Sequence, residues 1–447
     1  MDIGTRARDS FDVTHRMVLS IAVPMTLGFL TTPLLGLTDT AVVGRTGDAA
    51  ALAGLAIGAV LFDLIFSSVS FLRASTTALV AQALGRGDRH EQQAVFWRAL
   101  VLSVGLGLII LATSPWLLSI GLRMMGPEGT AAAATATYFS IRILAGPLTL
   151  TNYTILGFVL GLGRGTTGLL LQTILNGTNI VLSIYLGLVL GWGVAGVAWG
   201  TLIGEGIAAA VGLALIIPRF DRKDGPKVAE ILDRAKLSAL FAINRDLMIR
   251  TFTLLAAFTL LTRIGTGFGA VVLAANAVLM NFFMIASFYL DGMANAAEQI
   301  VGRAIGARFR EGFDRAIRLT AIWSLGLALV SCLFFLIFGN AIIDFMTTAA
   351  DVRAIAANYL PWAAMTALTG ALAFQMDGVY IGATWSREMR NMMLLAFTGY
   401  CLSLALFVPL FGNHGLWLSL NLFLALRGIL LLARLPARVA QSFTESH

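Results

Sequence analysis

Residues 17–44 read MVLSIAVPMTLGFLTTPLLGLTDTAVVG, and Asp39 is the only charged residue in this run. About 20 consecutive apolar residues suffice to cross a bilayer as a helix, so the run predicts a membrane span. A carboxylate at the centre of such a helix costs roughly 2.5–3.5 kcal/mol. We therefore expect Asp39 to face protein or water rather than lipid, which is the usual setting of an ion-coupling group.

The composition of the whole chain indicates a polytopic helical membrane protein. Hydrophobic residues make up 58% of it, charged residues 12%, and the mean hydropathy is +0.84. Ordinary globular domains carry about 25% charged residues. The apolar runs are continuous, which argues against a transmembrane β-barrel, since barrel strands alternate. We read twelve membrane spans and expect an all-α fold.

The basic residues follow alternate loops between the predicted spans. Most of the 31 lysines and arginines fall on the side that holds the two chain ends, and this explains the net charge of +7 without nucleic-acid binding. The loops on the opposite side carry only Arg45, Arg123, Arg263 and Arg353. By the positive-inside rule, both termini are expected in the cytoplasm. We expect the protein in the cytoplasmic (inner) cell membrane.

The two halves of the chain align at a constant offset of 221 residues. LVAQALG at 79–85 then corresponds to IVGRAIG at 300–306. The same offset pairs Tyr138 with Tyr359, Gly157 with Gly378, and Gly161 with Gly382. Each repeat has six spans, so both insert in the same direction, and parallel repeats are typical of transporters. We expect two six-helix lobes, 1–217 and 237–447, joined by a cytoplasmic linker, 218–236. A duplicated scaffold without transport is the alternative.

Polar residues of the first repeat fall at a similar depth, where they could form one pocket around Asp39. On the fifth span they share one helix face, and on the fourth they are four positions apart. The predicted cavity residues are Tyr138, Arg142, Asn176, Asn179, Ser183 and Thr201. Two alternatives stay open. Such amides and hydroxyls often join helices without binding a ligand, and Arg142 could simply neutralise Asp39 or Glu205.

Pro24 and Pro33 both interrupt the first span, and a proline removes a backbone hydrogen bond and favours a kink. Because Asp39 lies six residues beyond the second proline, its protonation could change which bend is favoured. We therefore predict a hinge at these prolines. Asp377 and Glu205 are candidates for a second ion site or gate. In the second repeat, however, the charged residues within the spans could pair with one another.

No motif for ATP hydrolysis or metal binding occurs in the sequence. GxxxxGK[ST], HExxH and CxxC are all absent, and the four histidines are scattered. We expect no enzyme activity, no metal and no cofactor, with an ion gradient as the energy source.

Three stretches together resemble the multidrug and toxic compound extrusion (MATE) family, and most closely its DNA-damage-inducible protein F branch. They are LTDTAVVGRTGDAAALAGLAIG at 37–58, GWGVAGVAWGTLIGE at 191–205 and QMDGVYIGATWSREMRN at 375–391. The resemblance implies twelve helices in two lobes around a cleft. It also implies export of bulky, often cationic amphiphiles in exchange for H⁺ or Na⁺.

By position, the resemblance implies that Asp39 couples the ion to bending of the first helix and that Asn179 and Thr201 belong to the same pocket. Ser183 departs from the family pattern, because many relatives carry an aspartate there. A serine cannot titrate, so this departure favours H⁺ over Na⁺. We predict a monomeric, secondary active H⁺-coupled exporter of small amphiphilic molecules. A Na⁺-coupled drug antiporter, a lipid-precursor flippase and a receptor without transport activity are the alternatives.

Overall fold

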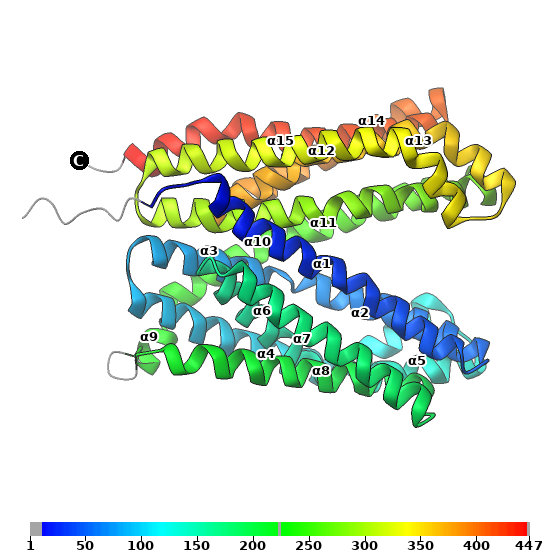
Figure 1. The fold of residues 1–447 in the computed structure, drawn as a ribbon, viewed down its shortest axis with the longest axis horizontal. Coiled ribbons are helices and arrows are strands. Elements are labelled where there is room, and N and C mark those ends of the chain that lie inside the picture. Colours follow the sequence, from blue (N-terminus) through cyan, green and yellow to red (C-terminus); the bar gives the residue numbers. More distant parts are fainter. Residues whose placement is uncertain (1–10, 222–224, 445–447) are drawn as a thin grey trace, which may run out of the picture. The chain divides into compact units, whose positions relative to one another are not determined.

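The computed structural model describes residues 11–221 and 225–444, and this part of the chain contains helices and no strand (Figure 1). Residues 222–224 of the predicted linker lie outside the described ranges. The described chain divides into two compact units. One division falls inside α1 (His15–Gly44), after Thr26, and the other inside α10 (Arg234–Thr266), after Phe241.

The N-terminal unit runs from Leu27 to Phe241. Its apolar core lies mainly between α2, α5 and the 3₁₀ turn η1, with a second core where α3, α4, α6 and α7 end or begin. Besides its parts of α1 and α10, its elements are α2 (Ala49–Ser68), α3 (Phe71–Gly85), α4 (Arg89–Met125), α5 (Gly129–Arg142), η1 (Ile143–Ala145), α6 (Gly146–Gly161), α7 (Gly165–Ile184), the π-helical turn η2 (Tyr185–Val189), α8 (Gly193–Ile216), η3 (Ile217–Arg219) and α9 (Val228–Ile231).

The C-terminal unit comprises the described residues up to Thr26 and those from Ala242 onward. Helix α13 packs against α11, α12 and α15, and is therefore surrounded by protein. The complete helices of this unit are α11 (Ala270–Gly306), α12 (Arg310–Met346), α13 (Ala350–Gly382), α14 (Ser386–Phe411) and α15 (Asn413–Thr444). The lobe boundaries expected at 217 and 237 stay a prediction.

Eleven helical segments of the described chain are long and apolar enough to cross a membrane. The predicted span that is missing from this set corresponds to α13, which is long enough at 33 residues but less apolar. Its polar side chains, among them Gln375 and Asp377, are buried against other helices. A helix enclosed by other helices needs no lipid-facing surface, so its mean hydropathy can be too low to identify it as a membrane span.

Two of the membrane-length segments, Ala49–Gly85 and Gly129–Gly161, are each built from two helices. The break between α2 and α3 falls at residues 69–70, where the hydroxyls of Ser68 and Ser70 donate to backbone carbonyls three residues earlier. Such local bonds compete with the regular helix. The break between α5 and α6 precedes Pro147, which stands in the first turn of α6, a position where a proline is tolerated.

The duplicated glycines occupy equivalent positions in the two units. A Cβ added to Gly157 on α6 would lie 2.5 Å from the carbonyl oxygen of Arg73, and one on Gly378 of α13 would lie 2.2 Å from that of Ala294. Arg73 and Ala294 are related by the same 221-residue offset as the glycines. Both repeats therefore use glycine to bring the same pair of helix backbones together. The predicted duplication is confirmed at the level of atomic contacts.

Gly378→Ala is expected to destabilise the protein, because its Cβ cannot be placed without moving the backbone of α11. Overpacking of this kind costs roughly 1–3 kcal/mol. The measurement is the thermal unfolding midpoint of the purified protein. Gly326→Ala on α12 is the matched control, since no atom lies within 4 Å of the added carbon. Equal midpoints for the two variants would contradict the close helix approach.

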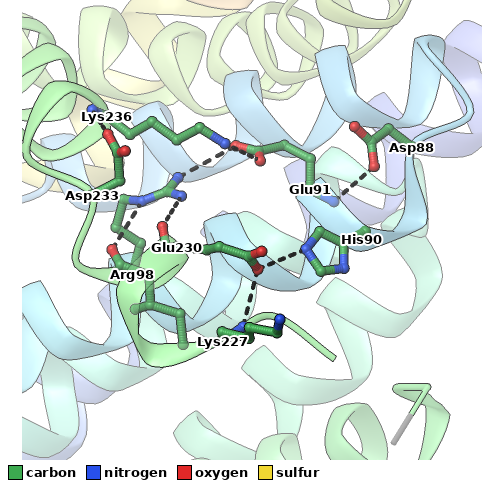
Figure 2. Close-up of polar contacts among 9 residues, drawn as sticks. Asp88, His90, Glu91, Arg98, Lys227, Glu230, Asp233 and Lys236 are labelled. Atoms are coloured by element: carbon green, nitrogen blue, oxygen red, sulfur yellow. Dashed lines mark hydrogen bonds and ion pairs between the residues drawn. The ribbon is translucent and has the colours of Figure 1, made fainter. Parts of the chain in front are cut away.

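The described part of the linker is fastened to the start of α4 (Figure 2). The guanidinium of Arg98, only 3% exposed, donates to the carbonyls of Ile231 at 3.2 Å and Glu230 at 3.1 Å. Glu91 lies between two cations, with Lys236 Nζ at 2.6 Å and Arg98 Nη1 at 3.4 Å. The linker therefore leaves the N-terminal unit as an ordered segment, and one face of the α4 N-terminus is covered.

Candidate functional site

Asp39 is buried on α1, with 8% of its surface exposed. Its Oδ1 atom has no hydrogen-bond partner among the described residues. Ser183 lies next to the carboxylate, and the positive charge of Arg142 acts on it from a greater distance. A buried carboxylate oxygen without a donor is costly while it is charged. Binding of a proton or another cation would relieve that cost.

Three predicted pocket residues form one hydrogen-bond chain beside Asp39. Ser183 Oγ donates to Asn179 Oδ1 at 3.0 Å, and Asn179 Nδ2 donates to Thr201 Oγ1 at 3.1 Å. Thr201 in turn donates to the carbonyl of Val197 at 3.2 Å. All three side chains are at most 4% exposed. Each of the three side chains thus donates one hydrogen bond that does not go to Oδ1 of Asp39, which is left without a partner in the described part of the chain.

A glycine stripe on α8 explains why these side chains meet. A Cβ on Gly200 would lie 2.8 Å from the backbone nitrogen of Ser183, and one on Gly204 would lie 3.3 Å from Asn179. One turn earlier, a Cβ on Gly196 would lie 2.6 Å from the backbone nitrogen of Gly187. The three contacts follow one antiparallel register, because each step of four residues forward on α8 is matched by a step of four residues backward on the partner helix. Glycines at this spacing let helices approach closely, and the pattern is visible in residues 191–205.

A cavity of about 350 Å³ lies within the N-terminal unit next to this chain. Thr201 connects the hydrogen-bond chain to the cavity, because it accepts a hydrogen bond from Asn179 and also lines the cavity. Asp39, Asn179, Ser183 and Tyr138 are not among the lining residues. The polar lining residues are Thr32, Asp63, Ser67, Ser70, Arg73, Arg142, Thr149, Asn152, Tyr153, Gln172, Asn176, Thr201 and Glu205.

Arg142 lines the cavity and contacts two aromatic residues, of which Phe62 also lines the cavity. It donates to the hydroxyl of Tyr138, which is 1% exposed, and lies 4.6 Å from the ring centre of Phe62. It makes no ion pair within the described chain, so it does not neutralise Asp39 or Glu205 by direct contact. Its charge still acts on Asp39 and Asp63 over a longer distance.

Glu205 and Asn176 each link a cavity wall to a second helix. Asn152 on α6 donates to Glu205 Oε2 at 2.6 Å and to the carbonyl of the same residue at 3.0 Å. Asn176 on α7 donates to Thr31 of α1 at 2.5 Å. Glu205 is thus fixed by a neutral amide. The sequence interpretation did not include Asn152 or Thr31, because nothing in a single sequence pairs helices α6 with α8 or α1 with α7.

Helix α1 continues through both predicted hinge residues. Residues 15–44 form one helix, with Pro24 buried and Pro33 exposed. Thr26 and Thr31, on either side of the unit division, donate to backbone carbonyls of their own helix. Such bonds often bend helices. The hinge itself stays a prediction.

Asp377 lies in the C-terminal unit and is enclosed by two arginines. Its Oδ2 pairs with Arg427 Nη2 at 2.6 Å and with Arg250, and all three are at most partly exposed. A second carboxylate, Asp246, pairs with Arg390 at 2.7 Å and Arg245 at 3.0 Å. Mutual pairing of the charged residues in this repeat, one of the two readings of the sequence, is therefore present for both of these aspartates.

Many apolar helices, an internal duplication and a partly polar cavity inside one unit define a polytopic membrane protein of the transporter class. The MatE family profile matches residues 24–185 and 247–407. DNA damage-inducible protein F of Escherichia coli strain K12 is 34% identical over 92% of this chain and 90% of its own length. The multidrug resistance protein PmpM of Pseudomonas aeruginosa is 26% identical over 96% of this chain and 92% of its own length.

Among solved structures, an outward-facing MATE family multidrug resistance transporter of the MOP superfamily aligns with a TM-score of 0.87. It is 18% identical, over 96% of this chain and 97% of that one. The chain therefore belongs to the MATE family of multidrug efflux transporters, whose members are transporters and not enzymes. The all-helical fold expected from the sequence, with twelve helices in two lobes, is confirmed by this match.

Proposed function

We propose that this protein is a proton-coupled exporter of amphiphilic organic compounds, cationic ones included, and that Asp39 carries the proton. The observation that supports this most is the buried Oδ1 of Asp39, which lacks a donor while its neutral neighbours bond one another. A group in that state gains from binding a cation. Because Thr201 joins its surroundings to the cavity, a change at Asp39 can reach a bound compound.

The donor set around Asp39 supports H⁺ over Na⁺. Hard cations take several oxygen ligands, and carboxylates are prominent among them. Within the described chain, Asp39 is the one carboxylate beside Ser183, Asn179 and Thr201, and the oxygens of Asn179 and Thr201 each already accept a hydrogen bond. A proton needs only the one free carboxylate oxygen. Na⁺ coupling is the alternative that the transport experiment below separates.

The walls of the cavity support an amphiphilic substrate. Its volume of about 350 Å³ falls in the range typical of small-molecule sites, roughly 300–1,000 Å³. Aromatic rings from Phe29, Phe62, Phe66 and Tyr153 supply apolar surface, and Asp63 and Glu205 supply negative charge. A ring system with a cationic group would find both. Arg73 and Arg142 also line the cavity, so a positive charge on the compound is not by itself sufficient for binding.

The transport cycle then follows from one titrating group. Asp39 takes up a proton while the site faces outward, α1 changes its bend near Pro24 and Pro33, and the cavity changes shape and releases the compound. The lobes rock, the site faces the cytoplasm, and the proton leaves. With a neutral compound each cycle moves one net charge, which is worth about 2.3 kcal/mol per 100 mV and adds to the pH gradient. Exchange of one proton for a monocation is electroneutral and is driven by the pH gradient alone. We place the protein in the inner membrane as a monomer with both termini cytoplasmic.

Dye efflux from proteoliposomes tests this function. Vesicles loaded with a cationic dye are given either an acidic exterior or an inward Na⁺ gradient at constant pH, with the membrane potential clamped. We expect the acidic exterior to accelerate efflux over protein-free vesicles and the Na⁺ gradient to have no effect. Efflux driven by Na⁺ alone would overturn proton coupling, and efflux driven by neither gradient would overturn the exporter assignment.

A further inference from the structure

A second cavity, of about 380 Å³, lies at one end of the N-terminal unit. Five helix ends meet there: α3, α6 and α8 with their C-terminal ends, and α4 and α7 with their N-terminal ends. Among the described residues, only Leu171 lines both this cavity and the one beside Asp39. It is the end that the distribution of basic residues assigns to the cytoplasm. The proposed transport cycle uses none of the polar groups that line it.

Three arginines from three different segments line this cavity. They are Arg89 at the start of α4, Arg164 before α7 and Arg219 at the end of η3. No aspartate or glutamate lines it, and none of the three makes an ion pair within residues 11–221 and 225–444. The three arginines are exposed at the cavity, whereas Arg98 on the neighbouring face of α4 is buried and paired. The cavity therefore has an excess of positive charge.

A buried amide in the wall lacks a partner. Gln93 is only 7% exposed and lines the cavity, yet no hydrogen bond to its side chain occurs in the described part of the chain. Its amide is therefore accessible from the cavity and available to a bound ligand. Beside it, α7 begins at Gly165 without a side-chain cap, so the amides of its first turn are available as donors. Helix starts of this kind favour anions.

The remaining wall is apolar. Phe158 and Phe220 pack edge to face at 5.6 Å, and Leu162, Leu215 and Ile216 continue the surface. An inorganic anion would leave this surface without a partner. An anion attached to a hydrocarbon chain would cover both parts of the cavity. Basic pockets between membrane helices are known to hold lipid head groups.

We propose that this cavity binds the phosphate of an anionic phospholipid, with the acyl chains along the apolar wall. Arg164 and Arg219 hold the phosphate through charge-assisted hydrogen bonds, and Gln93 donates its amide. This site lies outside the drug cavity, so it holds a resident lipid rather than a transported compound.

Lipid binding to the purified full-length protein, followed by native mass spectrometry, tests the proposal. The probes are dioctanoyl phosphatidylglycerol, the zwitterionic dioctanoyl phosphatidylcholine, and inorganic phosphate as a competitor. We expect phosphatidylglycerol to bind at least about tenfold more tightly than phosphatidylcholine. Both lipids carry the phosphate, but the choline cation of phosphatidylcholine would lie close to the three arginines that line the cavity, whereas the glycerol head group is uncharged. Inorganic phosphate should compete only weakly. Phosphate that displaces the lipid at equal concentration would overturn the lipid assignment in favour of a free-anion site.

Two variants locate the binding. Arg164→Gln/Arg219→Gln should weaken phosphatidylglycerol binding by about tenfold or more. Arg86→Gln/Arg45→Gln removes the same charge from exposed arginines that do not line the cavity, and should bind like the wild type. Gln93→Leu keeps all charges and should weaken binding several-fold, which tests the site without changing net charge. Wild-type affinity in the double arginine variant and in Gln93→Leu would overturn the proposal.

Discussion

Asp39→Asn is expected to abolish gradient-driven export while the protein stays folded. Asparagine has nearly the shape of the carboxyl group but cannot exchange a proton, so the variant stays in a state that resembles the protonated form. The stability should be retained, because the change removes a buried charged oxygen that has no donor. The measurement is dye efflux from proteoliposomes under an acidic exterior, with the thermal unfolding midpoint recorded for the same preparation.

Glu128→Gln is the matched control for this experiment. It makes the same change of charge at an exposed residue that precedes α5 and does not line the cavity. The control should export at the wild-type rate. An Asp39→Asn protein that exports dye against its gradient at the wild-type rate would show that another group carries the proton.

Asp377→Asn is expected to have the largest effect on stability. The substitution leaves the buried guanidinium of Arg427, 2% exposed, and that of Arg250 without their shared carboxylate. Two nitrogens of Arg427 already lack hydrogen-bond partners in the described chain. Breaking a buried ion pair on one side costs roughly 3–5 kcal/mol. For a unit of about 200 residues this lowers the unfolding midpoint by roughly 6–20 °C.

The control is Asp314→Asn in the same unit. Asp314 pairs with Arg310 at 3.8 Å, and both side chains are at least 60% exposed. Exposed pairs of this kind contribute about 0–1 kcal/mol, so the midpoint should hardly move. The comparison also separates the two readings of Asp377. If Asp377 is an ion-coupling residue, Asp377→Asn will keep its midpoint and lose coupled export, which is the opposite of what the two ion pairs predict.

The sequence was informative wherever one helix determines the outcome. Asp39 in an apolar run, the single face of α7 that carries Asn179 and Ser183, and the 221-residue offset all reappear in the structure. Residues that are four apart on a helix must share a face, and a repeat must use equivalent contacts. For the same reason, the glycine stripe of α8 was present in the sequence as a four-residue period.

The sequence did not show which residues of different helices meet. It grouped Asn179, Ser183 and Tyr138 with the cavity lining, whereas none of them is a lining residue in the structure. It did not include Asn152 and Asp63, which do line the cavity. The position of a side chain depends on its depth in the membrane and on the rotation of its helix about the helix axis. The sequence allows an estimate of the depth but not of the rotation relative to neighbouring helices. That rotation is set by packing, here by glycines that admit a neighbouring backbone at less than 3 Å from a would-be Cβ.

The number of protons released when a drug binds tests the role of Asp39 most directly. Calorimetric titration in buffers of different ionisation enthalpy gives this number, because proton release is linked to the change in protonation between the free and bound states. We predict a release of up to about one proton for the wild type, varying with pH, the same for Glu128→Gln, and none for Asp39→Asn. Undiminished proton release by Asp39→Asn would contradict the account.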